Sequence, residues 1–342
     1  MTTRGVTLAA LLAALGRPSW WVLALAGFLV RGGVLLFLVA IVSLPSPLVI
    51  SNLVAPLVPA YLGRVDPALL VVIGLGVTFA IGCLVAGSWI GAMTEIALVR
   101  DARDAMADEG LRSRPPVRAG RLLSIRVAAA HLLAHVPTAL ALAVGAVRIV
   151  NVAYVELTSP FEVTTPLVLR VIAGAAAPIA AIVVVWLVCE ILGGLAARRM
   201  ILDGASLLAG IRGSARDLIR RPTGTLVPAL ATTLVLAIDL AALLGAITVV
   251  WSQVRDRLAG SLADGVAVTL ALLAFGGTWV GALALTGLID AWRSAAMTFE
   301  AERAVVASTV RTGSDPDPGG TFGASAGRRP GDWSTGDGSG SL

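Results

Sequence analysis

Residues 68–98 read ALLVVIGLGVTFAIGCLVAGSWIGAMTEIAL, a run in which Glu95 is the only charged side chain. A helix needs about 20 apolar residues to cross the hydrocarbon core of a bilayer, so this run is long enough to span a membrane and project beyond it. Five more runs meet the same requirement, at about 20–43, 127–150, 167–197, 225–251 and 266–289. The sequence therefore predicts an all-α membrane protein with six transmembrane helices.

The composition agrees with lipid as the surrounding solvent. Apolar residues make up 57% of the 342 residues, charged residues only 14%, and the mean hydropathy is +0.89, which exceeds what a soluble domain with a polar exterior carries. All 26 basic residues are arginine, which fits a protein from a GC-rich bacterial genome. No basic and aromatic groove is visible, so we expect no nucleic-acid partner.

The arginines also predict how the chain crosses the membrane. Twenty of them lie in the N-terminal segment, after the second and fourth runs, and after the sixth, whereas five lie in the opposite segments. Cytoplasmic segments carry the excess of arginine, so we expect both termini on the cytoplasmic side of a bacterial inner membrane. Residues 1–19 then form a cytoplasmic or interfacial segment, 20–305 the six-helix domain, and 306–342 a disordered tail.

An internal repeat predicts three helical hairpins of one type. Residues 87–93 (GSWIGAM) in the second run match 277–283 (GTWVGAL) in the sixth, and Arg17-Pro18-Ser19 before the first run matches Arg221-Pro222-Thr223 before the fifth. GxxxG spacing allows two helix backbones to approach closely. We therefore interpret four glycines as helix-packing positions: Gly87, Gly91, Gly277 and Gly281.

The segment between the fourth and fifth runs predicts an amphipathic helix on the inner leaflet. One face is apolar, and the other carries Arg212, Arg216 and Arg220, with Arg221 following. Each arginine near the surface of an anionic membrane contributes about 1 kcal/mol, so anionic lipid headgroups are the expected partner. The alternative is that this helix docks on a membrane or cytoplasmic protein.

Two further patterns accompany the six spans. Arg220-Arg221-Pro222 leads from the amphipathic segment into the fifth span, and residues 291–298 (AWRSAAMT) close the sixth. With them, most of the membrane region resembles uncharacterised bacterial membrane proteins related to the membrane domain of glycerophosphodiester phosphodiesterases. The resemblance implies a fold and no activity.

Charged side chains at membrane depth are costly and are therefore candidates for function. Arg31 and Asp239 lie near the middle of the first and fifth runs. Counted from the matching Arg-Pro corners, they lie roughly 21 and 27 Å along their helices. An extended arginine side chain covers most of the difference between these two depths. We expect them to form an ion pair if the two helices touch, either as a structural pair or as part of a transport site.

A second group of ionisable residues lies in the third and fourth runs. His131 and His135 are one helical turn apart, and Glu190 lies at a similar depth. Two imidazoles and a carboxylate have the chemistry to relay a proton or bind zinc, but HLLAH lacks the glutamate of HExxH. We expect no cofactor and identify no catalytic residue, and Glu95 is interpreted as a helix-packing carboxylate.

The function expected first is a structural, regulatory or accessory membrane component, because no catalytic constellation is present in the sequence and the spans contain few polar residues. Two alternatives stay open. A permease or permease subunit is favoured by the repeat and the midplane charges, and a water-filled cavity near Asp239 would support it. An intramembrane lipid-modifying enzyme depends on the His and Glu group alone, so we lean away from an enzyme.

Overall fold

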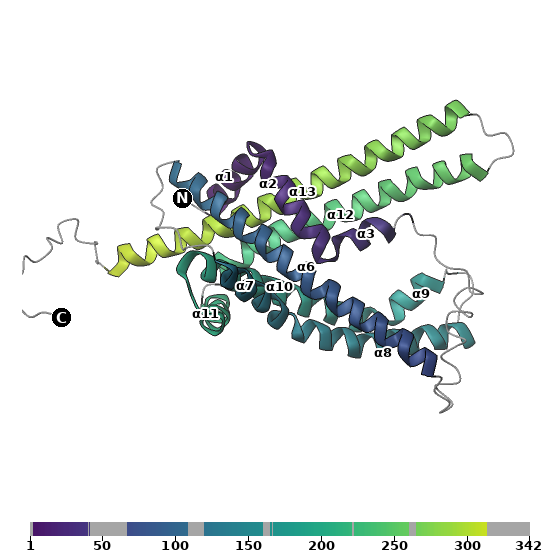
Figure 1. Cartoon of the computed structure of the whole chain (residues 1–342), viewed down its shortest axis with the longest axis horizontal. Coiled ribbons are helices and arrows are strands. Elements are labelled where there is room, and N and C mark those ends of the chain that lie inside the picture. The colour runs from purple at the N-terminus through teal and green to yellow at the C-terminus, as the bar shows by residue number, and fades with distance from the viewer. Residues whose placement is uncertain are drawn as a thin grey trace, which may run out of the picture. The chain divides into compact units, whose positions relative to one another are not determined.

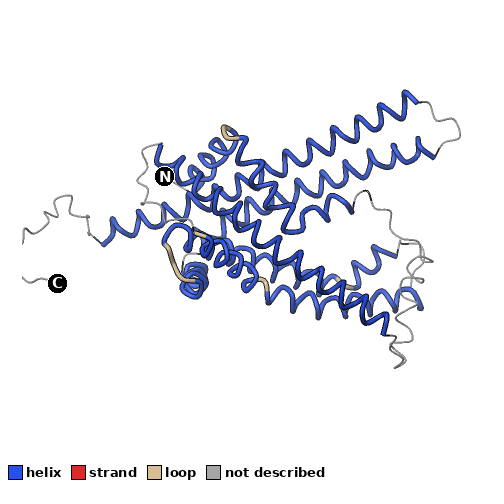
Figure 2. The backbone as a smooth tube through the Cα atoms, in the orientation of Figure 1, coloured by secondary structure: helices blue, strands red, loops and turns tan. Residues whose placement is uncertain are grey.

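The computed structural model of the chain describes residues 3–39, 41, 67–108, 120–159, 165, 167–220, 222–259 and 265–312. Within these ranges nearly all of the backbone is helical, as Figure 2 shows. Six helical segments are apolar and long enough to cross a membrane: Pro18–Leu38, Pro67–Met106, Arg121–Thr158, Ala176–Asp203, Gly224–Leu258 and Gly265–Arg303. The prediction of an all-α, multi-pass membrane protein is confirmed at this level. The disordered tail was predicted to begin at residue 306, but residues 306–312 are helical, and 313–342 lie outside the described residues.

Three spans are divided into shorter helices (Figure 1). The first consists of α2 (Pro18–Phe28), the π-helical turn η1 (Leu29–Gly33) and α3 (Val34–Val39). The third consists of α7 (Arg121–Ala134) and α8 (Val136–Thr158). Before the fourth, α9 (Leu167–Gly174) is separate from α10 (Ala176–Asp203), so the single run expected at 167–197 is two helices.

Each break has a local cause. Gly32 has φ 110°, a conformation that glycine adopts without the steric cost that other residues meet. Pro137 and Pro178 stand near the starts of α8 and α10, and proline has no N–H with which to continue the preceding helix. His135 and Ala175, the residues between the helices, have φ −91°, ψ 0° and φ −103°, ψ 15°.

The remaining spans are long helices that extend past the predicted runs. They are α6 (Pro67–Asp108), α12 (Pro222–Ala259) and α13 (Gly265–Thr312). The chain divides into two compact units, Met1–Glu302 and Arg303–Leu342, and the helix packing described here belongs to the first. In that unit the ends of α6 and α13 pack with α1 (Thr3–Leu15) and α2 into one apolar cluster. This packing explains why both helices continue beyond the length that a bilayer requires.

The N-terminal segment forms α1, and this helix has two different faces. Ala10 and Ala14 are fully buried against the bundle, whereas Leu8 and Leu12 are exposed. Two tryptophans tie α1 down: Trp21 Nε1 donates a hydrogen bond to the Ala14 carbonyl (2.7 Å), and Trp292 Nε1 donates one to the Thr7 carbonyl (2.9 Å). The small residues of α1 therefore face protein, and its leucines form the outer face.

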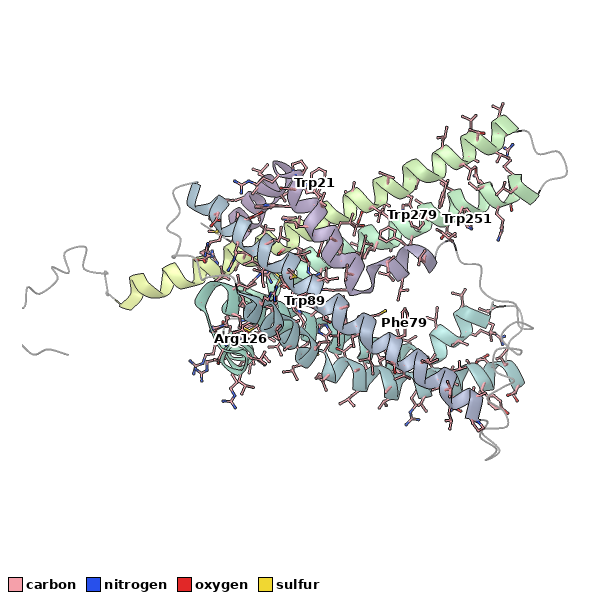
Figure 3. All side chains as sticks on the ribbon, in the orientation of Figure 1. Trp21, Phe79, Trp89, Arg126, Trp251 and Trp279 are labelled. Atoms are coloured by element: carbon pink, nitrogen blue, oxygen red, sulfur yellow. The ribbon has the colours of Figure 1, made fainter. Side chains whose placement is uncertain are left out.

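An aromatic cluster connects α3, α12 and α13. The ring centroids of Trp251 and Phe275 are 5.2 Å apart, those of Phe275 and Trp279 are 5.6 Å apart, and Phe37 lies 5.9 Å from Trp279. Figure 3 labels Trp251 and Trp279 on their two helices. Aromatic pairs at these separations add to the stabilisation from burial alone, so the cluster holds α3 against α12 and α13.

The predicted amphipathic helix is α11 (Leu207–Arg220), which packs on α10, α7 and α12. It follows Gly204, whose φ of 68° ends α10 in the left-handed conformation typical of helix C-termini. Asp217 on α11 accepts hydrogen bonds from Arg199 on α10. Arg212, Arg216 and Arg220 are exposed, and Arg221 lies outside the described residues. Its lipid or protein partner stays a prediction.

The four glycines predicted to pack against helices divide into two pairs. A Cβ atom on Gly87 would lie 2.6 Å from the Val30 carbonyl oxygen, and one on Gly91 would lie 2.6 Å from Arg31 Nε, so this face of α6 meets η1 closely. Around Gly277 and Gly281 no heavy atom of the described residues lies within 4 Å of such a Cβ. Among the described residues Gly277 and Gly281 therefore meet no neighbouring helix, because small residues permit a close approach but do not require one, and helix packing at these two positions stays a prediction. The three-hairpin repeat stays a prediction.

Candidate functional site

A cavity of about 590 Å³ lies where the first span, α6, α7, α10, α12 and α13 meet. Its size falls within the range of small-molecule sites. One part of the wall is ionisable: Arg31, Glu95, His131, His135, Glu190, Arg198, Asp290 and Arg293. The rest is mainly apolar and includes Leu23, Phe28, Leu84, Leu132, Leu236 and Leu240. The bundle thus combines a charged region and an apolar region in one space.

Two of the ionisable side chains reach the cavity from helix breaks. Arg31 belongs to η1, and His135 is the residue between α7 and α8. Gly91 leaves the room that the Arg31 side chain occupies on the face of α6. At a helix break, side chains can point in directions that a straight helix does not allow. The breaks in the first and third spans therefore place Arg31 and His135 in the cavity wall.

Glu95 on α6 is the centre of the first set of contacts. Its Oε2 atom accepts hydrogen bonds from Arg31 Nη2 at 2.5 Å and from His131 Nε2 at 2.7 Å. Its Oε1 atom lies 3.5 Å from Arg198 Nη1. The Glu95 side chain is only 9% exposed. One buried carboxylate therefore joins the first span, α7 and α10.

Glu190 on α10 is the centre of the second set. Its Oε1 atom accepts a hydrogen bond from Arg293 Nη2 at 2.6 Å, and its Oε2 atom lies 3.3 Å from His135 Nε2. Arg293 Nη1 also lies 3.5 Å from Asp290 Oδ1 one turn earlier on α13. This set connects α10 and α13 with the break between α7 and α8.

His135 has an acceptor opposite each ring nitrogen. Its Nδ1 atom donates to the His131 carbonyl at 2.8 Å, because a carbonyl oxygen only accepts. Its Nε2 atom faces the Glu190 carboxylate. If His135 is neutral and Glu190 is ionised, the Nε2 atom and the carboxylate are both acceptors and cannot form a hydrogen bond. Both contacts are satisfied only when one extra proton is bound, on either the His135 imidazole or the Glu190 carboxylate. The pair is therefore a place where the site can hold a proton.

Arg198 has a different role, because it is almost completely buried. Its Nη1 atom donates to the Gly194 carbonyl at 2.9 Å, and its Nη2 atom donates to the carbonyl and hydroxyl oxygens of Ser294, both at 3.1 Å. The side chain is 4% exposed. Arg198 therefore fastens α10 to α13 behind the cavity and presents little surface to a ligand.

The ion pair predicted between Arg31 and Asp239 is not present in the described part of the chain. Arg31 pairs with Glu95, and the buried Oδ2 atom of Asp239 has no hydrogen-bond partner among the described residues. The depth count assumed a straight first helix, whereas η1 directs Arg31 to α6. On α12, Thr233, Leu236 and Leu240 line the cavity beside Asp239, which does not itself line it.

The predicted group of His131, His135 and Glu190 does lie together in one wall. The two imidazole centroids are 6.5 Å apart, but each ring faces a different carboxylate, His131 facing Glu95 and His135 facing Glu190. Among the described residues no group of three or more histidine, cysteine or acidic side chains is arranged to hold a metal ion. Zinc binding has no support in this geometry, and the proton role stays a prediction.

Three further residues of the site were assigned other roles from the sequence. Glu95 was interpreted as a packing carboxylate, and Arg198 and Arg293 were counted among the arginines outside the membrane. For Glu95 a usable signal existed, because it lies four residues beyond Gly91 and so on the helix face that small residues open to a neighbour. For Arg198 and Arg293 the sequence offered no such signal.

Comparison of the chain with known protein families, with curated proteins and with solved structures gave no match. The resemblance to the membrane domain of glycerophosphodiester phosphodiesterases stays a prediction. What the structure itself provides is a membrane bundle with a cavity whose wall holds three arginines, three carboxylates and two histidines.

Proposed function

We propose that the protein is a permease or a permease component that holds a small solute in this cavity. The observation that carries the proposal is the cavity itself, with about 590 Å³ of space beside charged side chains at the meeting point of the helices. Helices that only pack against one another fill the space between them, since protein interiors are close-packed. A space of this size with a partly charged wall is consistent with a ligand that enters and leaves.

The breaks in the spans support the same function. Transporters commonly build their binding sites from discontinuous helices near the middle of the bilayer, and π-helical turns are frequent at functional sites. Here the Arg31 and His135 side chains, which lie at two breaks, are 33% and 29% exposed. They are the most exposed of the ion-paired side chains in the cavity wall.

The proposed location is the inner membrane of a bacterium, with both termini in the cytoplasm. The support for this orientation is the distribution of arginine along the sequence. In this orientation the exposed arginines of α11 lie beside the inner leaflet, where anionic lipid headgroups would attract them.

A structural or accessory role is the second candidate, and one observation favours it. Gly277 and Gly281 form an exposed GxxxG pair on α13, a pattern that accepts a neighbouring helix in membranes. In that role the ionic contacts would hold the helices together, and the cavity would be dry. The third candidate, an intramembrane lipid-modifying enzyme, is supported only by the contact between His135 and Glu190.

Hydration of the cavity separates the first two functions. Ser88 lines the cavity, so Ser88→Cys would be placed in a background with Cys83→Ala and Cys189→Ala, in reconstituted vesicles. We expect a small charged methanethiosulfonate reagent to modify it. Thr286→Cys is the control, because Thr286 is fully buried and does not line the cavity.

A second control is Cys83 retained in a protein that carries only Cys189→Ala, because Cys83 is exposed and does not line the cavity. If Ser88→Cys reacts as slowly as these two controls from either side of the membrane, the cavity is dry. The permease proposal then fails and the accessory role gains.

A further inference from the structure

The most exposed charged side chain at the cavity wall is that of Arg31, which is a hydrogen-bond donor. Arg31 uses its Nη2 atom for Glu95 and for the Gly91 carbonyl, at 2.5 and 3.1 Å. Its Nη1 atom has no acceptor among the residues that the structure describes, although a guanidinium has five N–H groups to donate. The exposed part of Arg31 lines the cavity, so its free donors are available to a ligand.

Two of the three carboxylates of the wall are surrounded by donors: Glu95 by Arg31, His131 and Arg198, and Glu190 by Arg293 and His135. The third, Asp290, is 22% exposed, and its Oδ1 atom lies 3.5 Å from Arg293 Nη1. A cationic ligand would have to displace an arginine from Glu95 or Glu190, or compete with Arg293 for Asp290. An anionic ligand meets a guanidinium with unused N–H groups, and guanidinium groups match carboxylate and phosphate oxygens in a two-point geometry.

The remainder of the cavity fits an apolar body. Leu23, Phe28, Leu36, Leu84, Leu236 and Leu240 are part of the wall. The volume of about 590 Å³ is far larger than a small anion needs, since a water molecule occupies about 30 Å³ in the liquid. The charged side alone cannot account for this space.

We propose that the cavity binds an anionic amphiphile, whose carboxylate or phosphate group is held by Arg31 and whose apolar part lies along the leucines. This inference rests on the proposed permease function and names the ligand class of the same site. The ligand anion uses the Arg31 donors that have no acceptor, while Arg31 Nη2 keeps its contact with Glu95. When the ligand binds, Glu95 keeps His131 and Arg198 as partners, so no buried carboxylate is left without a counter-charge.

The test measures binding to the purified full-length protein in a neutral detergent by native mass spectrometry. The probes are dodecanoate and dodecyl phosphate, with dodecanol as the apolar body without an anion and inorganic phosphate as the anion without an apolar body. We expect saturable 1:1 binding of the two anionic amphiphiles and at least about tenfold weaker binding of dodecanol and inorganic phosphate. Equal binding of dodecanol, of inorganic phosphate or of a dodecyltrimethylammonium cation overturns the proposal.

Variants locate the binding. Arg31→Gln removes the charged donor, and the loss of a charge-assisted hydrogen bond predicts about 10- to 100-fold weaker binding. Arg170→Gln is the matched control, because Arg170 pairs with Glu156 and does not line the cavity. Ser88→Asp adds a carboxylate to the wall without breaking an ion pair and should also weaken binding. Unchanged affinity in both Arg31→Gln and Ser88→Asp refutes the assignment.

The two proposals fail in different ways. If Ser88→Cys is modified by the charged thiol reagent but neither anionic amphiphile binds, the cavity is hydrated and the ligand class is wrong. If Ser88→Cys is not modified and no probe binds, the permease function itself fails.

Discussion

Replacement of Glu95 by glutamine tests the centre of the ionic network. The change keeps the shape of the side chain but removes the charge that faces Arg31 and His131 at 2.5 and 2.7 Å and Arg198 at 3.5 Å. Removing one partner of a buried ion pair costs about 3–5 kcal/mol, whereas coupling energies measured between membrane helices are smaller, on average about 0.6 kcal/mol. Since one carboxylate has three partners here and Arg198 is almost fully buried, we expect a loss of about 3 kcal/mol.

Thermal unfolding of the detergent-solubilised protein, followed by size-exclusion chromatography after heating, measures this loss. With an unfolding entropy of about 2.1 cal/mol/K per residue, each kcal/mol shifts the Tm of a chain of 342 residues by about 1.4 °C, so Glu95→Gln should lower the Tm by about 4 °C. The control is Asp256→Asn, because Asp256 and its partner Arg255 are 73% and 60% exposed and 3.7 Å apart. Exposed pairs of this kind contribute at most about 1 kcal/mol.

A double variant separates the ionic contact from a general packing defect. Arg31→Gln in the Glu95→Gln background removes the guanidinium that the first change leaves without its carboxylate, so part of the lost stability should return. If Glu95→Gln unfolds at the same temperature as Asp256→Asn, or if the two changes at Arg31 and Glu95 are simply additive, the network does not hold the bundle together.

Three more predictions concern individual residues. Gly91→Ala should destabilise the protein by about 1–3 kcal/mol, because its Cβ would lie 2.6 Å from Arg31 Nε, whereas Gly277→Ala should leave the Tm unchanged or slightly raised; equal effects would contradict the packing of η1 on α6. Asp239→Asn should stabilise the bundle by about 1 kcal/mol, because it removes a charge from a group whose buried oxygen has no partner among the described residues; a lower Tm would reveal a partner in the membrane. The third prediction replaces three exposed arginines of α11 by glutamine together: Arg212, Arg216 and Arg220. The share of anionic phospholipid that copurifies with the protein should then fall, as measured by lipid mass spectrometry. An unchanged share would argue for a protein partner.

The six spans were predictable because apolar length is a property of the sequence alone. The close packing at Gly87 and Gly91 was predictable for a similar reason, since small residues at this spacing open one face of a helix. The same pattern at Gly277 and Gly281 meets no neighbour in the part of the chain that the structure describes. A pattern of small residues shows where a backbone can approach, and the presence of the neighbour depends on the tertiary arrangement.

The partner of Arg31 could not be predicted, because it depends on the five-residue π-helical turn Leu29–Gly33. Depth along a straight helix favoured Asp239, but Gly32 with φ 110° and the π-helical turn around it redirect the side chain to Glu95. The spans of α7–α8 and α9–α10 show the same limitation. Their prolines indicate an interruption, yet the direction in which His135 leaves the break is fixed by contacts with Glu190 on another helix.

The charge balance of the cavity has an electrical consequence. Three arginines and three carboxylates cancel, so only a proton shared by His135 and Glu190 and a bound anion would carry net charge. A membrane potential of 100 mV changes the free energy of moving one net charge across the bilayer by about 2.3 kcal/mol. If one proton accompanies each monovalent anion, these contributions cancel, and movement of the occupied site would be electrically silent. Uptake of such an anion would then follow the pH gradient and be insensitive to voltage.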